Sequence, residues 1–441
     1  MNTETNPVTY PVSSVAEVYD ACHPDIPLED VNDTRYVDLT AVRGGESLVK
    51  SIAYAIERTR SPNFHQQLVT GHRGSGKSTE FFQLKARLEN HGYFVVYLDV
   101  GETLDLGDIS YLDILIGIAK AIVGELEAAG IDLNENLLTE VLAWLAEKTI
   151  ITERNAESEG KVSANLGLAA NIPFLAKALA EATGHIKSGS KRREEIRTVL
   201  ERELSLLIER LNTLIDDART RLQRQGYKDL VVIVDQLEKM AYRTNKDGTS
   251  NHKELFVHHA GQLKSLHCHI IYTVPIDLIF NVNLGDAFGS NASFIIPMVN
   301  LKDSLGNEKL REVIAHRINI EQVFSQQELV DKLIEMSGGS LRDLMRLVRL
   351  ACQNTDEIIE STDVDRAIRA LIREYDRLVK EDDIQLLKRV NETKRLDGSF
   401  ADLLGLRVIH EYRNGDTWYD LHPAVRAISW IDRALNPPAI L

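Results

Sequence analysis

Short apolar runs recur along the first two thirds of the chain, and polar stretches separate them. The runs lie at residues 67–70, 93–100, 229–235, 269–273 and 293–296. An apolar run of this length without alternation is typical of a strand that is buried on both faces. Longer stretches with three-four spacing of apolar residues lie between the runs. We therefore predict an α/β fold in which helices cover both faces of a parallel sheet.

Helical spacing predicts most of the elements outside these runs. Helices are expected at about residues 46–60 and 111–129, and apolar residues over 196–222 mark one face of a long amphipathic helix. Residues 153–190 are rich in Ala, Gly, Ser and Asn, and resemble a flexible or loosely packed insertion. From about residue 307 to 373 the pattern is entirely helical.

The two ends of the chain depart from this alternation. Residues 1–33 are polar and contain four prolines, which predicts an extended arm. Near the other end, two strand-like runs at 408–412 and 417–421 flank an Asn-Gly pair at 414–415. An Asn-Gly pair between two such runs is a strong hairpin signal. Helices followed by a terminal hairpin indicate a winged-helix module.

A phosphate-binding motif directly follows the first predicted strand. Residues 71–78 read Gly-His-Arg-Gly-Ser-Gly-Lys-Ser, a complete G-x-x-x-x-G-K-[ST] loop. Glycines let backbone N–H groups converge on phosphates, Lys77 adds a positive charge near the β- and γ-phosphates, and the Ser78 hydroxyl can join a Mg²⁺ shell. An amphipathic helix follows, so its N-terminus also faces the phosphates. The predicted nucleotide-binding residues are Gly71, His72, Arg73, Gly74, Ser75, Gly76, Lys77, Ser78 and Thr79.

Acidic residues after the third apolar run are the candidates for catalysis. Asp235 ends this run and is expected to hold Mg²⁺ through water, opposite Ser78. Hydrolysis also needs a base that orients the attacking water. Gln236 follows Asp235, and the next acid is Glu238, which we predict to be this base. A surface glutamate paired with Lys239 is the alternative interpretation of Glu238.

Three further residues are candidates for contacts with the nucleotide. Thr273 ends a strand and is expected to contact the γ-phosphate or the attacking water, unless it is an ordinary β-branched strand residue. Arg342 is expected in the first turn of a helix that follows two glycines, with Arg346 and Arg349 on the same face. A solvated basic face is the alternative there. Tyr36 lies near the expected base pocket, where it would stack on the purine or belong to the core.

Composition narrows the class of protein. With 44% hydrophobic residues, 27% charged residues and a formal net charge of −15, the chain is typical of soluble globular proteins, and its acidity argues against a generic polyanion binder. No apolar run reaches the roughly 18 residues of a membrane span. Three widely separated cysteines and a polar N-terminus predict a cytoplasmic location.

Taken together, these motifs resemble those of AAA+ ATPases of the origin-recognition-like clade, and of the related STAND and KAP-type signalling NTPases. Residues 71–78 resemble Walker A, residues 230–235 resemble Walker B, and Thr273 looks like sensor 1. Arg342 looks like the sensor 2 arginine of a helical lid. Residues 412–426 look like the wing and the following helix of the winged-helix domain in these families.

The resemblance implies a P-loop NTPase sheet of the ASCE or AAA+ type, with ATP and Mg²⁺ as ligands, and a division into four parts. These are an extended arm over residues 1–33, a P-loop ATPase core over 34–300 with a helical insertion at about 105–225, a helical lid over 301–375, and a winged-helix domain over 376–441.

Two departures from the family pattern bear on function. The acid after Asp235 is displaced to Glu238, which is closer to the STAND and KAP pattern, and residues 274–300 contain no Lys or Arg at the usual place of an arginine finger. These departures favour slow hydrolysis and a switch over a ring-coupled motor. The leading hypothesis is an ATP-operated switch that controls self-assembly or a protein partner. Only the resemblance to STAND proteins implies a role in bacterial phage defence or stress signalling.

Two alternative functions stay open. The first is a DNA-associated ATPase, either an origin-recognition-like loader or a transposition-type regulator. Residues 374–441 carry ten Lys or Arg and twelve Asp or Glu, a balance that does not favour binding to phosphates. The second alternative is a nucleotide-bound scaffold with little turnover, in which Gln236 leaves the site without an efficient base.

Overall fold

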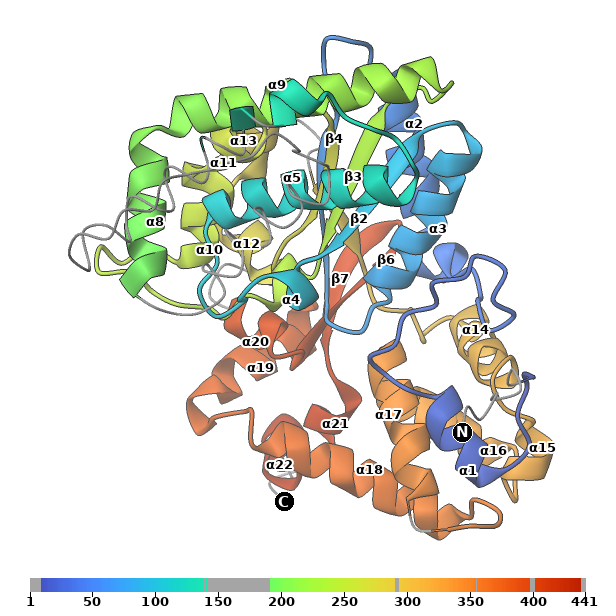
Figure 1. Ribbon diagram of the computed structural model, residues 1–441. Helices are drawn as coiled ribbons and strands as arrows, with labels where there is room; N and C mark the ends of the chain where they lie inside the picture. The colour runs from blue at the N-terminus through green and yellow to red at the C-terminus, as the bar shows by residue number, and fades with distance from the viewer. Residues whose placement is uncertain are drawn as a thin grey trace. The chain divides into compact units, whose positions relative to one another are not determined.

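The structure is a computed structural model that describes residues 9–138, 140–141, 144, 191–289, 293–353, 355–396 and 401–437 (Figure 1). The insertion predicted at residues 153–190 lies outside these residues. The chain forms two compact units. Unit 1 comprises Met1–Ser51, Thr70–Gln83 and Ile295–Leu441, and unit 2 comprises Ile52–Val69 and Leu84–Phe294.

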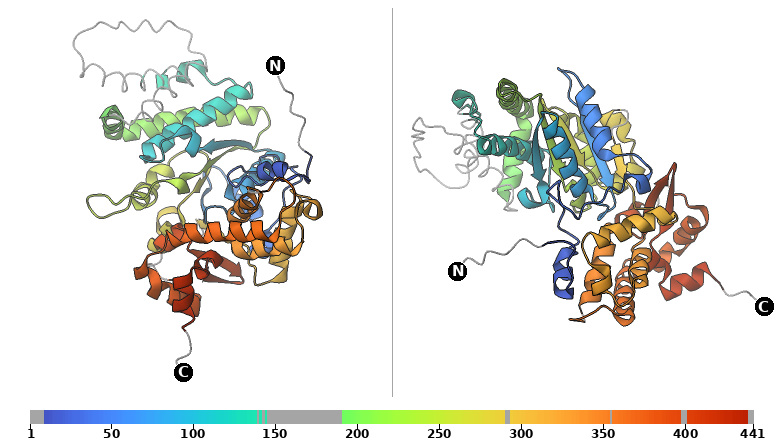
Figure 2. Two further views of the ribbon diagram at one scale, coloured as in Figure 1. Left: turned by 90° about the horizontal axis from the view of Figure 1, so that it is seen from below. Right: turned by 90° about the vertical axis from the view of Figure 1, so that its right-hand side faces the viewer.

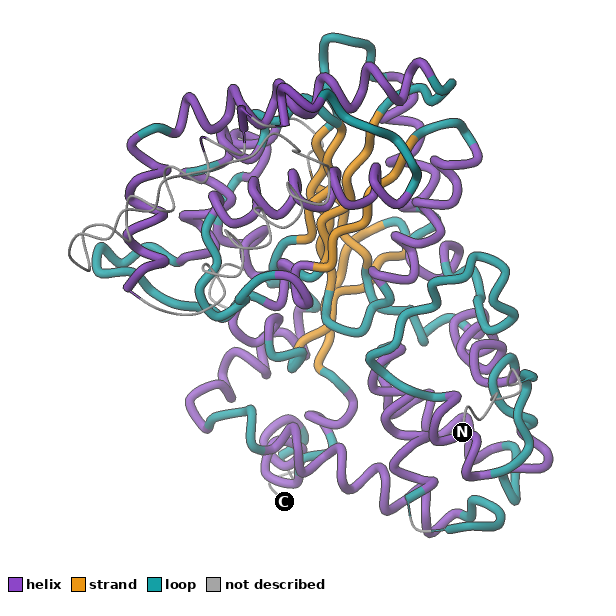
Figure 3. Tube along the Cα trace, in the orientation of Figure 1, coloured by secondary structure: helices purple, strands orange, loops and turns teal. Residues whose placement is uncertain are grey.

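A five-stranded sheet forms the centre of the α/β fold, and its strands run side by side in Figure 3. Its strands are β1 (Gln66–Gly71), β2 (Phe94–Asp99), β3 (Leu230–Asp235), β4 (His269–Thr273) and β5 (Ser293–Ile296). They lie in the order β2-β3-β4-β1-β5. The pairings of β2 with β3, β3 with β4 and β4 with β1 are parallel.

This topology confirms the predicted α/β fold and its parallel sheet. Because β4 lies between β1 and β3, the strand that precedes the phosphate loop and the strand that ends at Asp235 are not neighbours. Every residue of β3 is buried, which explains why its sequence is apolar throughout rather than alternating.

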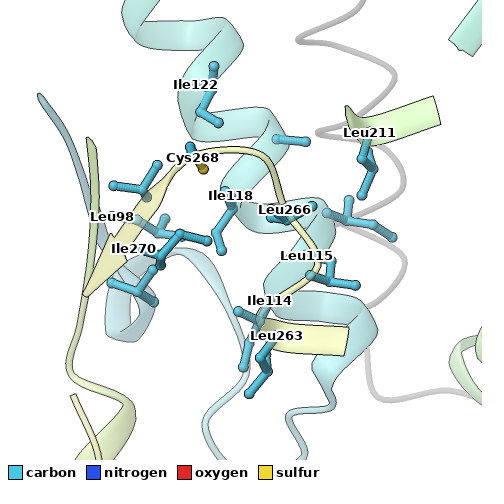
Figure 4. Packing of buried hydrophobic residues seen from close by; sticks show 14 of the residues in the cluster. Leu98, Ile114, Leu115, Ile118, Ile122, Leu211, Leu263, Leu266, Cys268 and Ile270 are labelled. Carbon is cyan, nitrogen blue, oxygen red and sulfur yellow. The ribbon is translucent and has the colours of Figure 1, made fainter. Parts of the chain in front are cut away.

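The core of unit 2 lies between the sheet and two of its helices. Helix α5 (Tyr111–Ala128) packs against β2 and β3, and α9 (Leu204–Arg224) packs against α5. Figure 4 shows Ile114, Ile118 and Ile122 of α5 beside residues of β2, β4 and α9. A capping box starts α5, because the Ser110 hydroxyl accepts the Asp113 N–H while the Asp113 carboxylate accepts the Ser110 N–H.

The remaining helices that lie wholly or partly in unit 2 are short or amphipathic. They are α2 (Leu48–Arg58), α3 (Lys77–Asn90), α4 (Val100–Thr103), α8 (Lys191–Arg202), α10 (Asn251–Lys253), α11 (Ala260–Leu263), α12 (Ile276–Asn281) and α13 (Leu284–Phe288), with the single turns η2 (Leu237–Lys239) and η3 (Glu254–His258). The single long helix predicted over residues 196–222 is wrong. It divides at Glu203 into α8 and α9, although Ile196 and Leu200 of α8 join the same core as α9.

Unit 1 contains the predicted all-helical region. It consists of α14 (Ser304–Ala315), α15 (Ile320–Val323), α16 (Glu328–Ser337), α17 (Leu341–Cys352) and α18 (Ser361–Asp376), together with the turn η1 (Thr40–Arg43). The arm predicted to be extended contains a helix, α1 (Val15–Ala21). A capping box between Ser14 and Glu17 starts α1, and the helix lies beside α17 (Figure 2).

The C-terminal part of unit 1 contains the predicted hairpin. Strands β6 (Ile409–Asn414) and β7 (Asp416–Leu421) pair antiparallel around Gly415, which has a φ of +95°. The helices around the hairpin are α19 (Ile384–Thr393), α20 (Ala401–Gly405), α21 (Pro423–Arg426) and α22 (Ser429–Leu435), with the turn η4 (Glu381–Asp383). Among the helices that the structure describes, none has the length and apolar character needed to cross a membrane.

Core packing in unit 2 can be tested at Ile118, which is fully buried in the cluster between α5 and the sheet. Ile118→Ala removes buried methyl groups and leaves a cavity, so we expect a loss of about 2–5 kcal/mol in the free energy of unfolding, measured by chemical denaturation. Ile26 is 63% exposed and provides the control. Ile26→Ala should change the free energy of unfolding by less than about 0.5 kcal/mol, and equal effects of the two variants would contradict this core.

Candidate functional site

The phosphate loop forms the turn between β1 and α3. Gly74 and Gly76 have φ values of +86° and +90°, in the left-handed region that favours glycine. Helix α3 begins at Lys77, whose ammonium group donates to the carbonyl oxygens of Gly71 at 3.0 Å and His72 at 3.2 Å. A buried cation thus lies over a loop that opens a 14-residue helix, which is the geometry expected of an anion site.

The loop approaches the start of α17 closely. The Arg342 N–H donates to the Gly74 carbonyl at 3.3 Å, and a Cβ at position 74 would overlap the Cβ of Arg342. Helix α16 ends at Gly338 in the left-handed conformation, and Ser340 caps α17, as the glycine pair in the sequence suggested. The structure therefore brings the predicted sensor residue Arg342 to the phosphate loop.

Residues of the N-terminal arm contact both of these elements. The guanidinium group of Arg342 forms an ion pair with Asp25, and the Leu28 N–H donates to the Thr79 hydroxyl at 3.2 Å. The Arg342 guanidinium, which was predicted to contact the nucleotide, is thus paired with Asp25 in this structure. Arg73 is exposed on the loop, whereas Ser75 is fully buried.

A buried arginine that the sequence did not single out also contacts the loop. The Arg43 guanidinium donates to the Ser75 carbonyl at 2.5 Å. Glu80 and Tyr36 lie close enough to interact electrostatically with Arg43. Burial, followed by the charge of Glu80, raises the pKa of Tyr36, so its hydroxyl stays protonated. Tyr36 therefore lies near the first turn of α3, and its stacking on a purine stays a prediction.

The side chain of His72 joins the loop to the C-terminal hairpin. His72 is 1% exposed, and its Nε2 accepts the Glu411 N–H of β6 at 2.9 Å. Burial, and then the charge of Lys77, lowers the pKa of His72 to about 3. The imidazole is therefore neutral, which the acceptor role of Nε2 requires. Sequence analysis placed His72 in the loop but gave no sign of this partner 339 residues away.

From His72, a column of aromatic rings extends to α18. The His72 and His410 ring centroids are 5.2 Å apart, those of His410 and His422 are 4.8 Å apart, and His422 stacks on Tyr375 at 4.3 Å. All three histidines are buried, and burial is the main cause that lowers the pKa of each. The column is thus a set of neutral rings between the loop and α18.

Asp343, next to Arg342, is the charge at the far end of this column. Its carboxylate is fully buried and accepts the Tyr375 hydroxyl at 3.0 Å and the Arg346 guanidinium at 3.0 Å. Arg407 lies 3.4 Å away. Burial alone would raise the pKa of Asp343, but the hydrogen bond with His422 and the charges of Arg407 and Arg346 hold it well below its usual range. Arg346, predicted on a basic face, thus has a structural partner.

In unit 2, the predicted acidic residue Asp235 lies at the end of β3. It is fully buried, accepts the Tyr97 hydroxyl at 2.6 Å through Oδ2, and accepts the Gln236 N–H at 2.7 Å through Oδ1. The Thr273 hydroxyl accepts the Leu237 N–H at 2.8 Å. Thr273 thus holds the turn after Asp235, and its predicted contact with phosphate or water is untested.

Asp99 is an acidic residue that sequence analysis missed at this edge of the sheet. It ends β2 in register with Asp235, and its carboxylate accepts the Gln236 side-chain amide. Gln236 has a φ of +72°, which turns the chain at the end of β3. Glu238 follows in the turn η2. The only available signal for Asp99 was its place after an apolar run. Within the described parts of the chain, no group of three or more His, Cys, Asp or Glu residues could hold a metal ion by itself.

Comparisons with known proteins add little to this geometry. No family model and no curated protein matches the chain. Among solved structures, Cdc6p from Pyrobaculum aerophilum matches with 12% identity over 90% of this chain and 98% of its own, at a TM-score of 0.38. A Walker-type ATPase of Pyrococcus abyssi matches with 16% identity over 91% of this chain and 99% of its own, at a TM-score of 0.36.

The buried His72 makes the stability of unit 1 depend on pH. Its pKa is 6.5 in an unfolded chain and about 3 here, so the unfolded state binds the proton more readily between these values. Protonation of the unfolded state therefore lowers the free energy of unfolding as the pH falls below 6.5. The loss is small at about pH 7.5 and reaches about 1.4 kcal/mol at about pH 5.5. The loss on acidification should shrink by this amount in His72→Gln, measured by urea denaturation at both pH values. His258→Gln, at an exposed position, should behave as wild type.

Proposed function

We propose that the chain binds ATP with Mg²⁺ at residues 71–78. The observation that carries this proposal is the conformation of the loop itself. Two of its glycines adopt left-handed backbone angles, Lys77 lies over the loop carbonyls, and the N-terminus of α3 directly follows.

Two residues have side chains that suit the Mg²⁺ ion that accompanies such a nucleotide. Ser78 and Asp235 offer hydroxyl and carboxylate oxygens, the ligand type that Mg²⁺ prefers. Asp235 is buried and bonded to Tyr97 and Gln236, so it is held in a fixed orientation as an acceptor. When bound, Mg²⁺ would neutralise charge on the phosphates. The other residues act on the nucleotide directly, with Lys77 and the loop N–H groups binding phosphate oxygens.

We further propose that nucleotide binding operates a switch. The support is the arrangement within unit 1, where the phosphate loop contacts the start of α17 through Gly74 and the hairpin through His72. Arg342 and its ion pair with Asp25 add the N-terminal arm to these contacts. A ligand that shifts the loop therefore changes three sets of contacts together, which is what a two-state element requires.

The output of the switch is proposed to be self-assembly or contact with a protein partner. The helices and hairpin of residues 376–437 fit the predicted winged-helix module, and the charge of residues 374–441 is close to neutral, with ten basic and twelve acidic residues. This balance favours a protein surface over a phosphate backbone as the partner. A role in phage defence or stress signalling is the biological setting that the STAND resemblance suggests.

Lys77→Ala tests nucleotide binding. Removing a charge-assisted contact should weaken ATP binding by at least about tenfold, measured by calorimetry or by a fluorescent ATP analogue. Lys85→Ala provides the control, because Lys85 lies on the same helix and pairs with Glu89 outside the loop. Equal ATP affinity in the Lys77 variant and in wild type would refute the proposed site.

Glu238→Gln tests whether the chain hydrolyses ATP through the predicted base. If Glu238 orients the attacking water, turnover should fall by about 10²–10⁴-fold while ATP binding persists. Asp99→Asn is the comparison, because the Asp99 carboxylate accepts the side-chain amide of Gln236 and is the alternative candidate for the base. Turnover that survives in Glu238→Gln and is lost in Asp99→Asn would move the base from η2 to the end of β2.

A further inference from the structure

Strand β6 joins the hairpin to the rest of unit 1 at neighbouring residues. At Glu411 the backbone N–H donates to His72 of the phosphate loop at 2.9 Å. At the next residue, the Tyr412 hydroxyl donates to the Gly338 carbonyl at 2.7 Å. Gly338 ends α16, four residues before Arg342. Adjacent residues of one strand thus hold the loop and the turn that places Arg342.

His72 contacts both Lys77 of the phosphate loop and Glu411 of the hairpin. Its carbonyl accepts the Lys77 ammonium at 3.2 Å, while its imidazole accepts the Glu411 N–H. Phosphate binding would draw Lys77 away from the loop carbonyls and toward the nucleotide. Because one residue makes both contacts, a shift of the loop backbone at this point moves the imidazole as well.

The contact at Glu411 is costly to lose. His72 and Glu411 are both buried, so a Glu411 N–H without the imidazole has no water to replace it. The Glu411 carbonyl also accepts the Met298 N–H at 2.9 Å, so both backbone groups of Glu411 have partners outside the hairpin. The loop can therefore move only together with β6, or by leaving a buried donor unsatisfied.

We propose that His72 is a positioning residue through which nucleotide binding and the C-terminal hairpin stabilise each other. This proposal rests on the proposed ATP site and concerns how the hairpin regulates ATP binding there. Occupation of the loop strengthens the contact between His72 and Glu411, and an intact hairpin holds the loop in its phosphate-binding conformation. Since coupling free energies are reciprocal, the factor by which ATP protects β6 equals the factor by which intact β6 raises ATP affinity.

The experiment uses the full chain and MgATP, with two readouts. One is ATP affinity, and the other is hydrogen exchange of the β6 amides with and without ATP. In wild type, ATP at about 100 times its Kd should slow exchange of the Glu411 amide about five- to tenfold, the factor expected for one buried hydrogen bond. Lys77→Ala should need a proportionally higher ATP concentration to reach the same protection.

Three substitutions at His72 separate positioning from packing. His72→Gln keeps an acceptor of similar reach and should retain ATP affinity and β6 protection to within about threefold. His72→Asn is too short to reach Glu411, and His72→Leu has no acceptor. Both should lower ATP affinity about five- to tenfold and reduce the protection of β6 by ATP by the same factor. Thr417→Ala, at an exposed position of the same hairpin, should match wild type on both readouts.

The outcomes distinguish the inference from the function on which it rests. Failure of wild type to bind ATP would remove the proposed function and the inference with it. ATP binding without any change in β6 exchange would overturn the inference alone. Wild-type protection in His72→Asn or His72→Leu would also overturn it, since the hydrogen bond would then be dispensable. If His72→Leu does not fold, His72→Asn supplies the same comparison with a polar side chain.

Discussion

The arrangement of unit 1 depends on how closely the phosphate loop approaches its neighbours. At Gly74 the loop has no room for a side chain, because a Cβ there would overlap the Cβ of Arg342. The left-handed φ of Gly74 and Gly76 is required at the same place for the turn itself. One constraint therefore serves two purposes, since the glycines that shape an anion site also admit the start of α17. A motif that suggests only ligand binding in the sequence is also a packing interface in the fold.

The sheet imposes a separate constraint on the acidic residues of unit 2. Parallel strands end at the same edge, so the register of β2 with β3 places Asp99 beside Asp235, and the pairing of β4 with β3 places Thr273 at the same edge. The left-handed turn at Gln236 follows directly and is held by Asp99 and by the Thr273 hydroxyl through Leu237. The chemistry proposed for this edge depends on strand order, which only the three-dimensional pairing fixes.

The sequence predicts helices and strands that a local pattern of residues specifies. It does not predict contacts between residues that lie far apart in the chain. All five strands of the sheet and the hairpin around Gly415 follow from apolar runs and a turn pair, and the structure confirms them within a few residues. The division at Glu203 was missed because the apolar face continues across it. Helix α1 was missed because the surrounding prolines outweighed a capping box of two residues. Arg43 and Asp343 carried no local signal, since their partners lie elsewhere in the chain.

The two environments that position 72 joins require a neutral hydrogen-bond acceptor there. A carboxylate there would place a negative charge beside the phosphates, and a lysine could not accept the Glu411 N–H. An apolar residue would leave that buried N–H unsatisfied. A neutral imidazole meets both demands, and burial together with the charge of Lys77 keeps it neutral. The same rings continue through His410 and His422 to Tyr375 and end on Asp343, which the hydrogen bond with His422 and the charges of Arg407 and Arg346 hold ionised. Because His72 makes both the contact with Lys77 and the contact with Glu411, a movement of the loop backbone at this residue also moves the acceptor of the Glu411 N–H.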